Sequence, residues 1–121
     1  MTMQPGPFRF EIYEIEFGVA WPEEISERHP AIIVSRQAII DRAHGLLTVV
    51  PATSSVPVIL SPTILAVEPT KMNGLKKTTY FKAEQIRAID FPKRVRARYG
   101  TLDINLENAL LQTIAVALDM P

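Results

Sequence analysis

Only the C-terminal part of this chain spaces its apolar residues as an amphipathic helix does. One apolar stripe is formed there by Leu106, Leu110, Ile114, Ala117 and Leu118. Their spacing places them on one face of a helix, and Asp103, just before the stripe, is a favourable N-cap. The sequence therefore predicts one terminal helix, and the rest of the chain has to fold without helical periodicity.

Before this helix, short runs of β-branched and aromatic residues alternate with turn residues, as in antiparallel β-proteins. In residues 8–17 the alternation changes phase near Ile12, which predicts a bulged or sharply bent strand. Further strands are expected at residues 31–35, 46–50, 56–60, 64–67, 78–81 and 86–89. We therefore expect a mainly β fold with a C-terminal α-helix, built as a small, strongly bent antiparallel sheet or a partly open, SH3-like barrel.

The composition limits the chain to one small core. It has 121 residues, 47% of them hydrophobic, and no cysteine, so we expect a single domain over residues 1–121 without disulfides or thiolate metal sites. No apolar run approaches the roughly 20 residues of a membrane span, and residues 1–10 lack a signal-peptide pattern. These features predict a soluble, cytoplasmic protein with no membrane contact.

Charge is segregated along the chain although the net charge is zero. Residues 1–30 carry two arginines and six glutamates, whereas residues 71–98 carry nine cationic and two acidic side chains. The acidic part includes a predicted loop at residues 18–30, and a turn with His44 is expected before residue 46. The basic segment indicates either a surface for a polyanion or the solvated edges of a small β-protein.

Several kinds of chemistry find no support in the sequence. His29 and His44 are the only histidines, no motif has metal-ligand spacing, and the five glycines do not form a phosphate-binding loop. We therefore expect neither a metal site nor a cofactor. The hydroxyl, imidazole, carboxylate and cationic groups that remain are those needed for metal-free RNA cleavage.

Four segments, taken in order, resemble the MazF/PemK family of toxin endoribonucleases. They are RHPAIIVS at residues 28–35, TVVPATSS at 48–55, KAEQIRAID at 82–90, and Arg94 and Val95 followed by Gly100, Thr101 and Leu102. The resemblance covers most of the chain. It implies a barrel-like sheet with a terminal helix, a homodimer and a cognate antitoxin. It also implies sequence-selective, metal-independent cleavage of single-stranded RNA through a 2′,3′-cyclic phosphate.

The resemblance also implies site residues. Thr53 matches the family's hydroxyl residue at the scissile phosphate, and His29 stands where the family usually has arginine. Imidazole is a competent acid or base near neutral pH, and Arg28 beside it supplies a cation. Lys82 and Glu84 match positions where some members have a basic and an acidic catalytic residue. A further set is expected to bind RNA: Lys76, Lys77, Arg87, Trp21, Ser54 and Ser55.

Each of these residues also has a purely structural interpretation. His29 before Pro30 can simply begin a strand, and the Thr53 hydroxyl can bond its own turn. Lys82 and Glu84 can form an exposed pair. Trp21 can anchor its loop on the sheet, and Arg87 can hold its strand to the next loop.

Two other functions compete with the nuclease. The first is a non-catalytic member of the same fold that binds RNA or a protein. The second is a gyrase poison of the CcdB type, whose C-terminal Trp-Gly-Ile contact has no counterpart in residues 117–121. For a homodimer, we expect apolar surface near the terminal helix to form the interface, because Leu111, Ala115 and Val116 exceed what one stripe needs.

Overall fold

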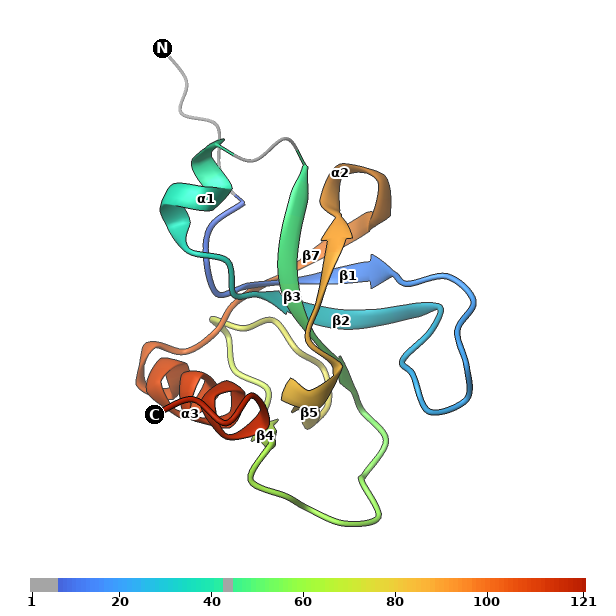
Figure 1. The fold of residues 1–121 in the computed structure, drawn as a ribbon, viewed down its shortest axis with the longest axis vertical. Helices are drawn as coiled ribbons and strands as arrows, with labels where there is room; N and C mark the ends of the chain where they lie inside the picture. The colour runs from blue at the N-terminus through green and yellow to red at the C-terminus, as the bar shows by residue number, and fades with distance from the viewer. Residues whose placement is uncertain (1–6, 43–44) are drawn as a thin grey trace.

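A computed structural model describes residues 7–42 and 45–121 (Figure 1). The elements in chain order are β1 (Glu11–Glu16), β2 (Arg28–Ile33), α1 (Gln37–Arg42), β3 (Leu46–Thr53), β4 (Ile64–Val67), β5 (Thr79–Lys82), η1 (Ala83–Gln85), β6 (Arg87–Asp90), α2 (Phe91–Arg94), β7 (Val95–Thr101), η2 (Ile104–Leu106) and α3 (Glu107–Ala117).

Within these residues, seven antiparallel strands form one sheet in the order β4-β5-β3-β2-β1-β7, with β6 paired to β3 outside this path. β3 is long enough to pair with three other strands. Residues 46–49 pair with β6, residues 49–51 pair with β2, and residues 52–53 pair with β5. The sheet therefore bends along β3 and stays unclosed, and the predicted mainly β fold with a C-terminal helix is confirmed.

The bent sheet separates two apolar cores. Ile12 of β1 faces the first core together with Leu110 and Ile114 of α3, while Tyr13 and Ile15 face the second. The β1–β7 ladder shifts register between Ile12 and Tyr13, so the predicted phase change near Ile12 is confirmed as an irregularity of this strand. Because successive side chains of a strand point to opposite faces, one strand supplies both cores.

Three expectations about strands and loops are wrong. Residues 56–60 form no strand, because Pro57 lacks an amide donor and Val56 and Val58 to Leu60 are exposed. β2 begins at Arg28 rather than after Pro30, because Arg28 pairs with Glu16 across the hairpin. Residues 37–42 form the short helix α1, whereas the only helix expected was the C-terminal one; less than two turns of helix leave no apolar stripe to detect.

The expectations for the C-terminal half hold in part. Helix α3 covers the predicted stripe from Leu110 to Ala117, with Leu110 and Ile114 buried, while Leu106 lies in η2 and Leu118 follows the helix. Asp103, however, precedes η2 and makes no side-chain capping bond; its carboxylate accepts hydrogen bonds from Thr70 and Asn73 instead. Strand β7 was not predicted. His44 lies outside the described residues.

Candidate functional site

A cleft of about 300 Å³, here named the basic cleft, opens between the start of β2, the turn after β3, the loop before β5, and β7. Its lining residues are Arg28, His29, Pro30, Ser54, Leu75, Lys76, Lys77, Thr79 and Tyr99. Five of the site residues predicted from the sequence are among them. The fold therefore gathers in one cavity an imidazole, a hydroxyl and three cationic side chains that come from three separate segments.

Arg28 and His29 are placed by the β1–β2 hairpin. In its register, Arg28 stands opposite Glu16 and His29 opposite Ile15. The Arg28 Nε donates to Glu16 Oε1 at 3.3 Å, and its guanidinium lies 3.8 Å from Glu14 Oε2. Two carboxylates thus hold Arg28 and offset its charge. Among the described residues no carboxylate lies within 4 Å of the ammonium of Lys76 or Lys77.

Asn73 fixes the loop that carries the two lysines. Its side chain is fully buried, its Oδ1 accepts from the amides of Thr70 and Leu75, and its Nδ2 donates to the Glu68 carbonyl and to Asp103. Every polar atom of the amide is therefore satisfied, which a buried side chain requires. As a result, Lys76 and Lys77 follow a backbone with a set path rather than a loose loop.

Tyr99 is a cleft residue that the sequence interpretation missed, because β7 was not recognised. Burial raises the pKa of the Tyr99 hydroxyl, and the nearby Glu14 carboxylate raises it further. The available signal was the alternation of Val95, Ala97 and Tyr99 with two arginines, the period of a strand.

The other six predicted residues lie outside the basic cleft, among them Thr53 and Lys82. Thr53 ends β3 just before Ser54, and its Oγ1 accepts from the Ser55 amide at 3.1 Å. Lys82 ends β5, opposite Ile64, and lines none of the cavities described here.

Glu84 and Ser55 are also separate from the cleft. Glu84, in η1, borders a depression of about 340 Å³ together with Glu23 and Glu24. Ser55 is exposed at the start of the β3–β4 connection.

Trp21 and Arg87, far apart in the sequence, meet at a second cavity of about 560 Å³, here named the loop pocket. Its lining residues are Phe17, Val19, Ala20, Trp21, Glu24 and Arg87. The Arg87 guanidinium carbon lies 4.7 Å from the centre of the Phe17 ring. Burial lowers the pKa of Arg87, while the Glu24 carboxylate raises it. The interpretation of Arg87 as a residue that supports the loop and the prediction that it contacts a ligand are both compatible with this position.

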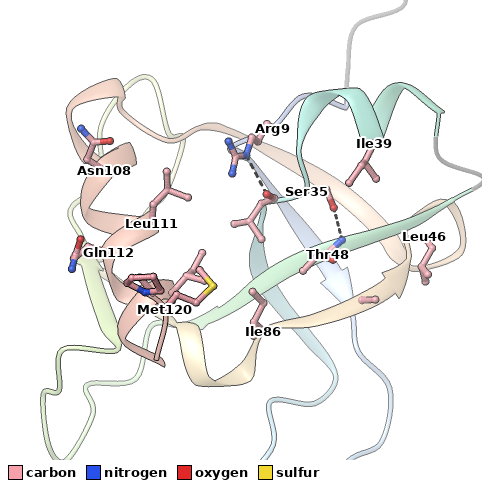
Figure 2. Close-up of a pocket in the computed structure, with 15 residues that line it drawn as sticks. Arg9, Ser35, Ile39, Leu46, Thr48, Ile86, Asn108, Leu111, Gln112 and Met120 are labelled. Atoms are coloured by element: carbon pink, nitrogen blue, oxygen red, sulfur yellow. Dashed lines mark hydrogen bonds between the residues drawn. The ribbon is translucent and has the colours of Figure 1, made fainter. Parts of the chain in front are cut away.

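A third cavity, here named the apolar groove, has a volume of about 820 Å³ and lies between α3, α1 and the β3–β6 ladder (Figure 2). Figure 2 shows Asn108, Leu111 and Gln112 of α3 on one side and Ile39 and Leu46 on the other. Leu111 and Ala115 line the groove, whereas Val116 is exposed and does not.

Two other kinds of site have no candidate among the described residues. In residues 7–42 and 45–121, no three histidine, aspartate or glutamate side chains are grouped so that they could hold a metal ion. Within the same residues, no helix has the length and hydropathy needed to cross a membrane.

Comparison with known proteins adds sequence and structural relatives. The sequence model of the family described as "PemK-like, MazF-like toxin of type II toxin-antitoxin system" matches residues 8–118. MazF from Deinococcus radiodurans aligns with a TM-score of 0.77 and 19% identity, covering 97% of this chain and 100% of that chain.

Two mycobacterial structures have similar scores. An endoribonuclease in complex with its cognate antitoxin, from a mycobacterial species, gives a TM-score of 0.75 at 24% identity, covering 96% of this chain and 98% of that chain. The Mycobacterium tuberculosis toxin MazF-mt6 gives 0.71 at 21% identity, covering 92% and 98%. No curated protein matches the chain. At these identities the structural likenesses support the fold alone.

Proposed function

The chain belongs to the PemK-like, MazF-like toxin family of type II toxin-antitoxin systems, and from this premise we propose that it is a metal-independent endoribonuclease that cleaves single-stranded RNA at selected sequences. The observation that carries the proposal is the basic cleft, where His29 lies with Lys76 and Lys77. Imidazole moves protons, and paired ammonium groups bind a phosphate.

In the proposed reaction the 2′-hydroxyl of the RNA loses its proton and attacks the adjacent phosphorus. The bond between phosphorus and the 5′-oxygen breaks, and that oxygen takes up a proton. The products are a 2′,3′-cyclic phosphate and a 5′-hydroxyl. Lys76 and Lys77 stabilise the charge on the pentacoordinate phosphorane, while His29 serves as the acid or base.

The remaining predicted residues are assigned to the borders of this site. Thr53 directly precedes Ser54, which lines the cleft, so we assign both hydroxyls to the substrate phosphate. Arg28 supports His29 from the hairpin. Lys82 and Glu84 lie outside the cleft and are proposed to act on RNA that extends beyond it.

The test is incubation of purified protein with a long RNA in EDTA, followed by mapping of the ends. We expect cyclic phosphate and 5′-hydroxyl ends at recurring sequences, and a rate at least about 100-fold lower in His29→Ala. Lys76→Gln and Lys77→Gln should each lower the salt dependence of RNA binding by about 0.7 log units per log unit of salt. The matched control is Lys93→Gln, an exposed lysine on α2 that does not line the cleft.

One observation favours a second function, that of a non-catalytic RNA-binding module. His29 replaces the arginine usual in the family and lacks the bidentate guanidinium fork. Salt-dependent RNA binding without cleavage at any pH from about 5.5 to 8.5, the range over which an unperturbed histidine titrates, would establish this alternative.

We also propose that two copies pair through the apolar groove and that a cognate antitoxin protein binds the dimer. Leu46 and Ile39 line the groove and are exposed, as expected for a surface covered by a second copy. Light scattering should report a dimer for the wild type and a monomer for Leu46→Glu. Val58→Glu, which adds the same charge at a fully exposed position outside the groove, should leave the dimer intact.

A further inference from the structure

The loop pocket has no role in the proposed phosphate chemistry, yet it holds an aromatic ring, a carboxylate and a guanidinium around one opening. We propose that it binds one unpaired guanine base of the RNA substrate, with Trp21 stacking on the base and Glu24 and Arg87 contacting its edges. This inference rests on the proposed function, because it names one base that the nuclease reads.

Trp21 offers a stacking surface on an ordered turn. The residue is 80% exposed, while its amide donates to Glu24 Oε1 at 3.0 Å and the Glu24 amide donates to its carbonyl at 2.8 Å. These two bonds hold the Trp21 backbone and the Glu24 carboxylate in one short turn. Unpaired bases in RNA are commonly bound by stacking on such aromatic rings.

Arg87 is held in place before any ligand binds. Its Nε and one terminal nitrogen donate to the carbonyl and side-chain oxygens of Gln85, and the guanidinium lies over Phe17. Gln85 also accepts from the Ile25 amide and donates to the Glu23 carbonyl, so it fixes the loop and the arginine together. The other terminal nitrogen of Arg87 remains available to a ligand, since the described hydrogen bonds use only Nε and NH2.

Guanine is the base whose edges match this pair of groups. Its N1–H and its exocyclic amino group are adjacent donors that suit the two oxygens of a carboxylate, and its O6 and N7 are acceptors for arginine. Adenine, cytosine and uracil do not present two adjacent donor groups of this kind. Glu24 and Arg87 therefore favour guanine over the other three bases.

Charge favours a base rather than a phosphate in the pocket. The loop carries Glu23, Glu24 and Glu27, which repel phosphate, whereas the basic cleft attracts it. The two cavities share the base of one hairpin, because Phe17 lines the loop pocket and Arg28, paired with the preceding Glu16, lines the cleft. One RNA strand bound at the hairpin can thus place its phosphate and a neighbouring base in different cavities.

The fluorescence of Trp21 tests this inference directly, because it is the only tryptophan in the chain. The ligands are 2′-O-methyl RNA heptamers of uracil with one central guanine, adenine or cytosine, and the all-uracil heptamer. Their blocked 2′-oxygen prevents cleavage. We expect quenching by the guanine heptamer with an affinity about 5- to 100-fold higher than for the others.

Variants separate base recognition from loop structure. Glu24→Gln keeps an acceptor for the Trp21 amide but loses one of the two acceptor oxygens, so it should abolish the guanine preference. Arg87→Lys should weaken that preference, and Glu23→Gln, the matched control on the same loop, should leave it unchanged. Equal quenching by all four heptamers, quenching by none, or an unchanged preference in Glu24→Gln would each overturn the inference.

These outcomes do not depend on the nuclease assay. A guanine preference without RNA cleavage would refute only the proposed catalysis. Cleavage by a protein whose Trp21 does not distinguish the heptamers would refute only the guanine pocket.

Discussion

The basic cleft is bordered by two connections that are built in opposite ways. Residues 68–78 carry Lys76 and Lys77 and are tied down by the buried amide of Asn73, with Leu75 in the first core. Residues 54–63 begin with Ser54 and Ser55 and then expose four large apolar side chains (Figure 1 shows this connection as a long green arc away from the sheet).

The difference shows which side chains of the cleft are held in position before a ligand binds. A site whose side chains are held by packing and hydrogen bonds loses little entropy when a ligand binds. The lysines meet this condition through their backbone, while the hydroxyls lie where an exposed connection begins. We therefore expect perturbations of residues 68–78 to change stability far more than perturbations of residues 54–63.

The largest effect is expected for Gly74→Ala. Gly74 has φ +66°, and a Cβ there would lie 1.9 Å from the carbonyl oxygen of Tyr99, which is backbone and cannot move aside. Both the left-handed conformation and the clash oppose the substitution. Urea unfolding should show a loss of about 4 kcal/mol or no folded protein at all. A loss under about 1 kcal/mol would show that the loop does not pack on β7 in this way.

Asn73→Ala should have the next largest effect. Removing the amide leaves the amides of Leu75 and Thr70 and the Glu68 carbonyl without their partner and removes one of the two hydrogen bonds that Asp103 makes with this loop. We expect a loss of about 3 kcal/mol in urea unfolding, because several buried groups lose their bonds at once. Thr78→Val is the control. It removes a hydrogen bond to Glu68 at an exposed position, and a similar loss there would contradict the special role of Asn73.

The sequence predicted the parts of the fold that depend on local pattern. The phase change at Ile12 and the stripe of α3 were recognisable because apolar periodicity follows directly from burial. Strand β7 was not, since Arg96 and Arg98 are exposed at the edge of the sheet and resemble a charged loop. The strand predicted at residues 56–60 was wrong for the opposite reason, because β-branched residues predict a strand whether or not a partner strand exists.

The candidate site shows the same limit. The resemblance placed His29 and Thr53 at strand ends from local sequence, but it gave no distances between segments. Trp21, Glu24 and Arg87 meet in one pocket because Gln85 donates a hydrogen bond to the Glu23 carbonyl. This contact joins distant parts of the chain, so local sequence did not predict it.

The pH dependence of folding stability tests this comparison at Tyr99, against which residues 68–78 pack. Burial and Glu14 raise the pKa of the Tyr99 hydroxyl above its ordinary value of 10.0. The unfolded chain therefore ionises first, and folding stability should fall as pH rises above 10, by at most about 1.4 kcal/mol per pH unit for this tyrosine. Tyr99→Phe should reduce this slope in urea unfolding between pH 9 and 11.

Tyr13 provides the comparison for that slope. Burial and a hydrogen bond to Glu11 also raise its pKa, so Tyr13→Phe should remove a further part of the decline. An identical slope in the wild type and in Tyr99→Phe would contradict the placement of Tyr99 beside Glu14.

The smallest effect is expected for Val58→Ser in the exposed connection. Its side chain is fully exposed, so the substitution removes no buried area, and the free energy of unfolding should change by less than about 0.5 kcal/mol. Leu75→Ala in the anchored connection should cost about 2 kcal/mol, because it empties a buried position. A loss of more than about 1 kcal/mol in Val58→Ser would contradict the comparison.

If that loss grew with protein concentration, a second copy covers residues 56–60 in solution, since association stabilises a fold by mass action. If it did not, the connection folds back onto its own chain, and the two borders of the basic cleft are equally fixed.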